Sequence, residues 1–403
     1  MKIALIGNMN NNFFSQMRYF RDLGMNAHLF LYQNEYEHFL PHYDTYQIEK
    51  YEPYIHTLSV ESSGKGLLLA NLNKIKEELQ GYDFFIGCGI APALFLKLKY
   101  QLDIFIPYAE EFELTSDDVF KLSARGFFNL DNILKYPIRR YTVSQQIKGI
   151  KHHTSKIIAS GVMQVTKDTI ERLNLADQHI KKYLLMVYKE ESQLKSPYIE
   201  RMKKSDLVVF SHTRQHWKDL KGLEKEDGVK ALDKLIIGYH DFIEKNPKVN
   251  PVLIFFEYGK DVDASKALIK KLDIEEYVQW LPLMPRKEIM GLIQHADIVV
   301  DALASSMWGG VGWEGLSRAK IMMQNILQTN EEYYAERGHN LPFIMKANKA
   351  EHVQKHLEDF IQNRAYFKEK SEENRIWFDN YAGIGLAQDY KNIIEELYDE
   401  KMK

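Results

Sequence analysis

The sequence has very little cysteine, and this restricts the sites it can build. Cys88 is the single cysteine among 403 residues. One thiol can form neither an intramolecular disulfide nor a cysteine-rich zinc cluster. Because a chain without disulfides is typical of a reducing compartment, we expect a cytoplasmic protein. Free cysteines are among the most buried residues, so we expect Cys88 to lie in a core.

Long apolar runs and an excess of charge of one sign are also missing. No run reaches the roughly 18 apolar residues of a membrane span, and the apolar N-terminal stretch turns polar at Asn8. Lys and Arg number 53 against 56 Asp and Glu, which gives a formal charge of -3. No whole-protein field attracts nucleic acid, so we expect no nucleic-acid partner. An anionic ligand must therefore be held by a local site.

Several well-defined catalytic motifs are missing as well. The sequence has no GxSxG elbow, P-loop or HExxH. Of a dinucleotide-binding GxGxxG fingerprint only Gly7 is present. His152, His153 and His212 lack cysteine or carboxylate partners at metal-ligand spacing. We therefore predict no metal and no cofactor.

Length and patterning indicate two α/β domains. A chain of 403 residues exceeds what one hydrophobic core usually supports. In both halves short apolar segments alternate with amphipathic helical ones, which is the order of a doubly wound parallel sheet. The predicted strands are 2–7, 26–32, 83–87, 104–108 and 156–159 in the first half, and 207–211, 252–257, 278–281 and 298–302 in the second. The principal predicted helices are 13–23, 230–244, 264–272 and 286–295.

The domain boundary is predicted within 189–204, a segment rich in Lys, Glu and Ser. It contains Pro197 and suits a connector. We expect an N-terminal domain over 1–190, a C-terminal domain over 191–375 and a C-terminal helix over 376–403. The apolar residues of that helix fit two arrangements: packing on its own domain, or returning to brace the N-terminal domain.

Two basic residues follow the first strand of the second half. Ligands of doubly wound sheets bind beyond the carboxyl ends of the strands. Arg214 comes directly after the strand 207–211, and Lys230 opens the next predicted helix. A guanidinium and an ammonium at one strand edge would neutralise a diphosphate. Ordinary surface charge is the alternative interpretation.

A glycine-rich loop follows the predicted strand 298–302. Three glycines in four positions permit close backbone approach, and the N–H groups of the helix that follows attract phosphate. An acidic residue near the helix start has a carboxylate that can accept both hydroxyls of a ribose. A purely structural glycine loop is the alternative. The candidate residues are Ser306, Trp308, Gly309, Gly310, Val311 and Glu314.

An asparagine-rich loop follows the first predicted strand of the chain. Its candidate residues are Asn8, Asn10 and Asn11. Because amide side chains both donate and accept hydrogen bonds, the loop suits a hydroxyl-rich ligand such as a sugar. A polar turn whose helix is capped by Asn12 or Ser15 explains the same residues.

Acidic residues follow the strand 104–108. Glu110, with Glu111 and Glu113 beside it, could face a cleft between the domains as a general base or a transition-state stabiliser. A solvated acidic loop is the alternative.

From 207 to 329 the chain resembles retaining glycosyltransferases of the GT-B fold, in particular glycosyltransferase family 4 of bacterial surface-polysaccharide clusters. Residues 230–236 read KALDKLI and resemble that family's KGxDxLI stretch, with Ala231 in place of the glycine. Arg214 is similar to the arginine that ends the first strand of the donor domain. The resemblance implies that Arg214 and Lys230 contact the donor pyrophosphate.

Two further segments carry the resemblance. Glu257 and Tyr258 lie in FFEYGKD, which looks like the strand-end segment beside the nucleotide base. The segment 306–314 resembles the family's Glu-x7-Glu motif, whose second glutamate binds the donor ribose and matches Glu314. Ser306 stands where the first glutamate would contact the donor sugar. The family's cleft histidine is not evident in the segment 108–111.

The resemblance implies an α/β, GT-B architecture of two Rossmann-like domains that face across a cleft. It also implies a metal-independent hexosyltransferase-type enzyme that moves a sugar, with retention, from a nucleoside-diphosphate sugar to a glycan or lipid-linked acceptor. The setting would be cell-surface polysaccharide or glycoconjugate biosynthesis. The N-terminal domain would receive the acceptor, and Arg214 and Lys230 would stabilise the leaving diphosphate.

Three alternatives stay open. Ser306 in place of a glutamate also suits a non-catalytic nucleotide-sugar-binding partner of another transferase. The carboxylates at Glu110 and its neighbours suit a sugar-nucleotide epimerase of the same architecture. Basic and aromatic residues within 121–156 suit either peripheral contact with the inner face of a membrane or a solvated basic surface.

Overall fold

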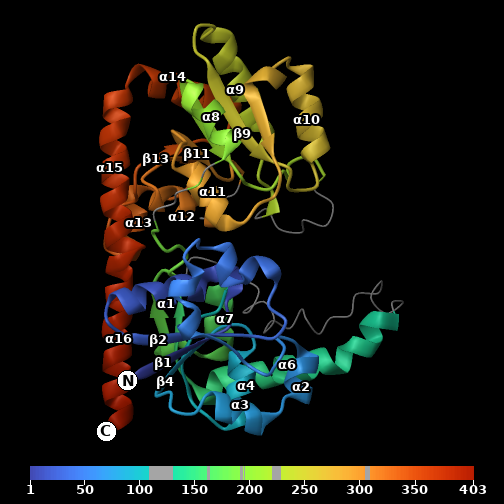
Figure 1. Cartoon of the computed structure of the whole chain (residues 1–403), viewed down its shortest axis with the longest axis vertical. Helices are drawn as coiled ribbons and strands as arrows, with labels where there is room; N and C mark the ends of the chain where they lie inside the picture. The colour runs from blue at the N-terminus through green and yellow to red at the C-terminus, as the bar shows by residue number, and fades with distance from the viewer. Residues whose placement is uncertain (109–129, 161–163, 191–193, 195, 220–227, 305–308) are drawn as a thin grey trace. The chain divides into compact units, whose positions relative to one another are not determined.

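The structure is a computed structural model that describes residues 1–108, 130–160, 164–190, 194, 196–219, 228–304 and 309–403 (Figure 1). The chain divides into two compact units. One unit combines Met1–Tyr188 with Ala382–Lys403, and the other is Lys189–Tyr381. A parallel sheet with helices packed on it forms the centre of each unit.

The first unit contains a seven-stranded sheet in the order β3-β2-β1-β4-β5-β6-β7. All its pairings are parallel. Chain order reverses between β1 and β4, which is the feature that defines a doubly wound sheet. The strands are β1 Lys2–Ile6, β2 Asn26–Leu31, β3 Ile55–Thr57, β4 Phe84–Gly87, β5 Leu102–Phe105, β6 Thr154–Ala159 and β7 His179–Lys181.

Helices cover both faces of this sheet, and alternate residues of β1 supply the two cores. Ile3 and Leu5 pack with α1 and α16, whereas Ala4 and Ile6 pack with the helices of the other face. Burial on both faces explains why the strands read as continuous apolar runs. The helices are α1 Asn12–Asp22 and α16 Ile384–Met402 on one face, and α2 Gly64–Leu69, α3 Leu72–Glu78, α4 Ala91–Leu98, α6 Leu130–His153 and α7 Gln164–Leu173 on the other.

The second unit contains a six-stranded parallel sheet in the order β10-β9-β8-β11-β12-β13. Its principal core joins β8 to α9 and α14 through residues such as Val209, Tyr239 and Leu357. The strands are β8 Leu207–Ser211, β9 Pro251–Phe256, β10 Val278–Leu281, β11 Ile298–Val300, β12 Ile321–Gln324 and β13 Ile344–Lys346. The helices are α8 Pro197–Lys204, α9 Asp233–Lys245, α10 Val262–Lys271, α11 Arg286–Ile293, α12 Gly310–Ser317, α13 Asn330–Arg337, α14 Ala350–Gln362 and α15 Arg364–Tyr381.

The predicted α/β class is confirmed, and the structure differs from several local predictions. The helix predicted from Lys230 begins at Asp233, because Ala231 has a left-handed φ of 51° and Lys230 bonds to other loops. The predicted connector is partly helical. Pro197 occupies the first turn of α8, where its missing N–H costs nothing, and the Ser196 side chain accepts from the Tyr198 N–H.

The C-terminal helical segment is divided between the units. α15 packs within the second unit and runs to Tyr381, so the predicted boundary at 376 falls inside it. After Ala382 and Gly383, α16 packs on α1 in the first unit. Leu386 and Tyr390 belong to the core of that unit. Of the two arrangements open from sequence, the structure has the return to the N-terminal unit. Within the described part of the chain, no helix is long and apolar enough to cross a membrane.

Candidate functional site

Arg214, Lys230 and the described part of the glycine-rich segment lie at the carboxyl edge of the second sheet, where chain order reverses between β8 and β11. Such a reversal leaves room for a ligand, because the two strands connect to opposite faces. The Lys230 N–H donates to the His216 carbonyl at 2.7 Å, and the Lys230 carbonyl accepts from the Leu303 N–H at 2.9 Å. The loops after β8 and β11 are thus joined through the backbone of Lys230.

The loop after β8 is fixed by the loop after β9. Asp261 accepts from the backbone N–H groups of Trp217 and Lys218 at 2.7 and 2.8 Å. Burial raises the pKa of Asp261, but these bonds outweigh it and lower the pKa. Gly259 has a φ of 117°, and a Cβ there would lie 2.5 Å from the Gln215 nitrogen. Only glycine fits this close approach, so Gly259 packs directly against the backbone of Gln215.

Basic side chains gather around His216 in this fixed loop. Burial lowers the pKa of His216, and the positive charges of Arg214, Lys260 and Lys230 add to the effect. Arg214 is exposed and Lys230 is half-buried. The structure therefore brings the two predicted diphosphate ligands to the same place, and it adds Lys260. Positive charge concentrated at a strand edge is suited to an anionic group.

Asp301, directly after β11, holds the start of the glycine-rich loop. Its carboxylate accepts from the Gly309 N–H at 3.2 Å and from the Ala302 N–H at 2.8 Å. A Cβ on Gly309 would lie 2.7 Å from the Asp301 oxygen, whereas a Cβ on Gly310 would meet no atom of the described residues within 4 Å. Gly309 is thus needed for packing, and the space at Gly310 is open. Val311 follows it in the first turn of α12.

Glu314 lies one turn inside α12 and is 8% exposed. One carboxylate oxygen lies 2.5 Å from His212 Nε2, and the other accepts from Arg286 Nε at 2.7 Å. Burial alone would raise the pKa of Glu314. The positive charges of Arg286 and His212 outweigh burial and lower that pKa to about 2. Glu314 is therefore an ionised, buried carboxylate with a protein donor on each oxygen.

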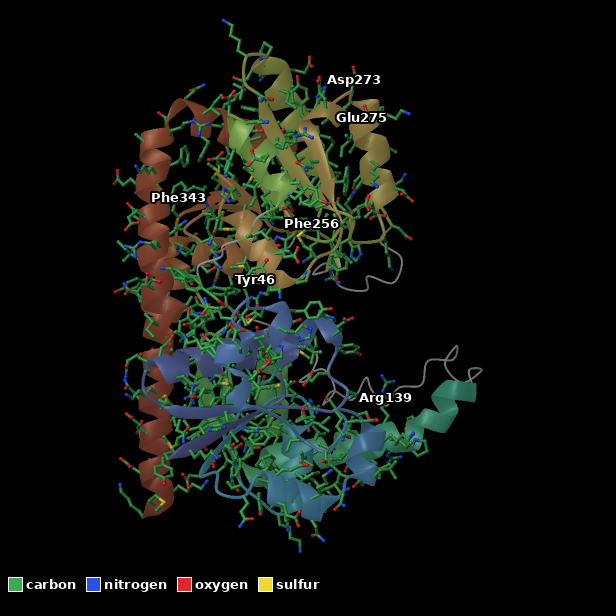
Figure 2. The ribbon with its side chains drawn as sticks, viewed as in Figure 1. Tyr46, Arg139, Phe256, Asp273, Glu275 and Phe343 are labelled. Carbon is green, nitrogen blue, oxygen red and sulfur yellow. The ribbon has the colours of Figure 1, made fainter. Side chains whose placement is uncertain are left out.

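Glu257 and Tyr258 lie at the end of β9, directly after Phe256 (Figure 2). The Glu257 carboxylate pairs with Lys266 of α10 at 2.5 Å, and Tyr258 is 42% exposed. The Tyr258 carbonyl accepts from the Gln215 N–H at 2.7 Å. These residues border the loop after β8. The exposed Tyr258 ring is the surface here that a nucleotide base could contact.

The remaining predicted residues of the glycine-rich loop and of the acidic loop lie outside the described residues. They are Ser306, Trp308, Glu110, Glu111 and Glu113.

The asparagine loop of the first unit bonds to its own surroundings. The Asn8 amide donates to Asn11 at 2.9 Å and to the Phe39 carbonyl at 2.5 Å, and its oxygen accepts from the Phe14 N–H at 2.9 Å. Asn11 donates to the His38 carbonyl at 3.0 Å. Asn8 and Asn11 are buried and Asn10 is exposed. This is a polar turn that supports α1, with Asn8 rather than Asn12 or Ser15 bonding to the helix N-terminus.

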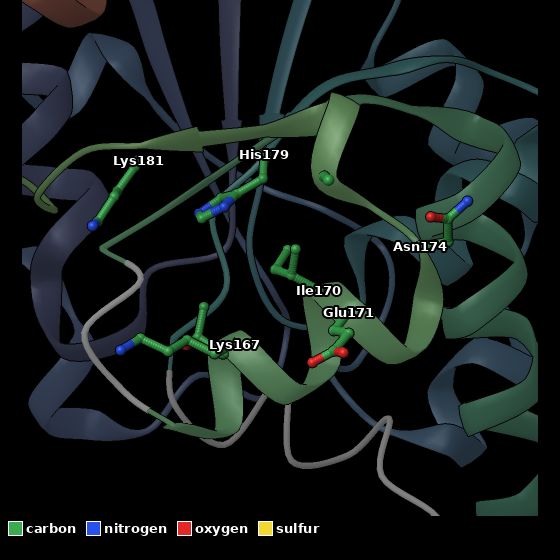
Figure 3. Close-up of a pocket in the computed structure, with 8 residues that line it drawn as sticks. Lys167, Ile170, Glu171, Asn174, His179 and Lys181 are labelled. Carbon is green, nitrogen blue, oxygen red and sulfur yellow. The ribbon is translucent and has the colours of Figure 1, made fainter.

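A separate cavity of about 450 Å³ opens between α7 and the edge strand β7 (Figure 3). Ile170 and Glu171 of α7 line one side, and His179 and Lys181 of β7 line the other. Among the described residues that line this cavity there is none of the predicted site residues.

Among the described residues of this site, His212, Lys260, Asp261, Arg286 and Asp301 are not among the predicted site residues. The position of His212 between a strand end and Arg214 is a sequence signal for it. Arg286 follows Pro285 at the start of α11, and nothing in its own segment points to Glu314.

No protein-family model and no curated protein matches the sequence. In structure the chain is similar to Anabaena Alr3699/HepE, solved in complex with UDP and glucose. That similarity has a TM-score of 0.60 and 13% identity, and it covers 98% of this chain and 100% of that chain. WaaG, a glycosyltransferase involved in lipopolysaccharide biosynthesis, is similar with a TM-score of 0.54 and 12% identity, over 97% of this chain and 99% of that one.

A putative UDP-N-acetylglucosamine 2-epimerase from Listeria monocytogenes is also similar. Its TM-score is 0.58 at 10% identity, covering 99% of this chain and 97% of that chain. At such identities the likeness shows the fold alone. The chain therefore has the GT-B architecture of two Rossmann-like domains that these proteins share.

Proposed function

We propose that this protein is a glycosyltransferase that uses a nucleoside-diphosphate sugar. The observation that carries the proposal is the meeting of Arg214, Lys230 and Glu314 at the chain reversal of the second sheet. Basic side chains there suit a diphosphate, and a buried ionised carboxylate suits hydroxyl donors. A nucleoside diphosphate carries both of these groups, the diphosphate and the two ribose hydroxyls, in one molecule.

In the proposed reaction, the bond between the sugar and the diphosphate breaks and charge develops on the departing phosphate oxygens. Arg214, with its planar fork of N–H donors, and Lys230, with its ammonium, stabilise that charge. The chain's own cations carry this role, so we propose a metal-independent reaction. We also propose retention and membership of glycosyltransferase family 4, on the sequence resemblance at Arg214, 230–236 and Glu314.

We propose that the acceptor binds to the first unit. The first unit would bind a glycan or lipid-linked acceptor, with α6 and its basic residues Arg139 and Arg140 as a candidate membrane-facing element (Figure 2). Both arginines are exposed. Cell-surface polysaccharide synthesis is the proposed setting, supported by the stated role of WaaG.

Two other functions have specific support. The likeness to a putative epimerase favours epimerisation of a nucleotide sugar on the same architecture. Ser306 at the position of the first motif glutamate favours a protein that binds nucleotide sugar without turnover.

One assay separates these functions. The full-length protein is incubated with UDP-, GDP- and CMP-sugars, with and without glycan and lipid-linked acceptors, and released nucleotide and sugar product are measured. We expect transfer from a diphosphate donor that EDTA leaves unchanged, with the donor's anomeric configuration kept in the product by NMR. CMP-sugars are the control, since they carry one phosphate. Binding without turnover contradicts the transferase, and interconversion of the donor sugar identifies an epimerase.

A further inference from the structure

Glu314 is held by two side chains that come from separate elements. His212 follows β8, Arg286 begins α11, and Glu314 lies in α12. Their contacts are the 2.5 Å and 2.7 Å bonds to the two carboxylate oxygens. We propose that His212 and Arg286 are positioning residues that orient the Glu314 carboxylate to receive the two hydroxyls of the nucleotide ribose. This inference rests on the proposed function and deepens it.

The number of bonds to the carboxylate supports this role. An ionised carboxylate has about four acceptor positions on its two oxygens. In the structure His212 uses one position on one oxygen, and Arg286 uses one on the other. Each oxygen thus keeps acceptor capacity. Two adjacent acceptors match the two O–H donors of a vicinal diol, whereas a phosphate offers no donor when ionised.

The two supporting side chains are themselves held in place. The His212 ring lies against Phe210 and Phe256, with ring centroids 5.7 and 6.1 Å away. Phe256, labelled in Figure 2, ends β9. Arg286 is the first residue of α11 and its side chain is 16% exposed. Groups fixed in this way lose little conformational freedom when a ligand binds, which is the advantage of preorganisation.

Charge fits the same role. Because the charges of Arg286 and His212 keep the pKa of Glu314 at about 2, the carboxylate is ionised at neutral pH in spite of its burial. An ionised carboxylate accepts hydrogen bonds and repels phosphate, so it selects for the ribose part of a nucleotide. Arg214 follows β8, as His212 does, and its exposed side chain is available for the phosphate part of the nucleotide.

A purely structural ion cluster is the competing explanation, since breaking a buried ion pair also destabilises a fold. The two roles differ in ligand selectivity. A structural defect weakens all nucleotides by the same factor. Loss of carboxylate orientation weakens a ribonucleotide more than a 2′-deoxyribonucleotide, because the deoxy compound lacks one of the two hydroxyls.

The experiment measures calorimetric binding of UDP and 2′-deoxy-UDP to the full-length protein, and of the corresponding GDP and ADP pairs if UDP does not bind. We expect wild type to prefer the ribonucleotide by about 10-fold or more, as for a hydrogen bond to a charged group. Arg286→Met and His212→Leu should reduce the preference to about 3-fold or less. His212→Gln should keep most of it, because its amide N–H can replace Nε2–H.

Arg364→Met is the matched control. Arg364 contacts Asp297 at 4.0 Å, before β11 at the opposite edge of the sheet, and its loss should leave the preference unchanged. If Arg286→Met does not fold by circular dichroism, Arg286→Lys and His212→Leu give the answer. Equal weakening of both nucleotides overturns the inference, and so does a wild type without preference, although the proposed function then survives. A wild type that binds no nucleotide removes the proposed function itself.

Discussion

The two units share a sheet topology but differ in the loop that follows their central strand. After β1, the buried amides of Asn8 and Asn11 bond to the protein itself. After β8, Asp261 fixes the backbone while Arg214 stays exposed. At the first chain reversal the protein itself therefore supplies hydrogen-bond partners to the two buried amides. The second loop differs in that Arg214 is exposed beside a backbone segment that Asp261 holds.

The largest test of this difference is removal of the outward charge. Arg214→Ala should lower kcat/KM for the donor by about 100-fold or more, because it removes a charge-assisted contact to the diphosphate. Steady-state kinetics with the donor found in the assay measure the effect. Lys245→Ala removes an exposed charge at the last turn of α9 and should leave kcat/KM unchanged. If Arg214→Ala and Lys245→Ala lose activity equally, the overall positive charge of the protein, and not a binding site at Arg214, accounts for the effect.

Lowering the pH should change the stability contributions of Glu314 in the second unit and Glu35 in the first unit in opposite directions. The folded pKa of Glu314 is about 2, below its ordinary 4.5. Its contribution to stability is present above pH 4.5 and is lost as pH falls toward 2, by roughly 3 kcal/mol at about 1.4 kcal/mol per pKa unit. Urea unfolding of wild type and Glu314→Gln between pH 7 and 3 should show about 2 kcal/mol of this loss, in wild type alone, because the remainder is lost below pH 3.

Glu35, which accepts from the Asn8 N–H at 3.2 Å, is the counterpart in the first unit. Burial raises the pKa of Glu35 in spite of its backbone hydrogen bonds. A raised folded pKa favours folding at low pH, and this contribution fades as pH rises above the ordinary value. Glu35→Gln should therefore remove a stabilisation by acid in the same unfolding series. If the free energy of unfolding of Glu35→Gln changes with pH in parallel with that of Glu314→Gln, the two carboxyls do not act in opposite directions.

Asn8→Ala should affect stability and spare nucleotide binding. It removes the side-chain bonds to Asn11, Phe39 and Phe14, and each buried partner left unpaired costs about 1–3 kcal/mol. Urea unfolding should register a loss of about 2 kcal/mol or more, with an unchanged nucleotide Kd by calorimetry. A weakened Kd in a folded Asn8→Ala variant would place ligand at the first loop as well.

The smallest expected effect on the fold is at Gly310. Its added Cβ would meet no atom in the described part of the chain, so Gly310→Ala should change stability by less than about 1 kcal/mol. Nucleotide affinity should still fall if the phosphate approaches the start of α12, as the glycine-rich sequence predicts. Gly309→Ala is the contrast, since its Cβ would meet Asp301 at 2.7 Å and displace the loop. Unfolding and binding measured on both variants separate packing from ligand approach.

The sequence predicted the central strands well, because burial on both faces leaves apolar runs that end at polar loops. β8 and β10 lie where expected, and Arg214 follows its strand. The central strand β12 and the edge strands β3, β7 and β13 were not predicted. The three edge strands have three residues each, and a run so short and partly polar carries no periodicity.

The contacts of Glu314 could not be read from sequence. Its partners Arg286 and His212 are 28 and 102 positions away, and only the sheet order brings them together. The start of α9 was missed for a similar reason. Lys230 has a helical sequence context, but hydrogen bonds from two other loops hold its backbone. Local propensity gives way where long-range contacts are stronger.

The membership of α16 in the first unit has a consequence for synthesis on the ribosome. The second unit, Lys189–Tyr381, is continuous and can fold as soon as it has emerged. The first unit emerges earlier, yet its core lacks Leu386, Tyr390 and Ile394 until the last turns of the chain are made. The apolar surface of α1 therefore stays uncovered throughout the translation of the second unit. Exposed apolar surface of this kind favours aggregation until α16 covers it.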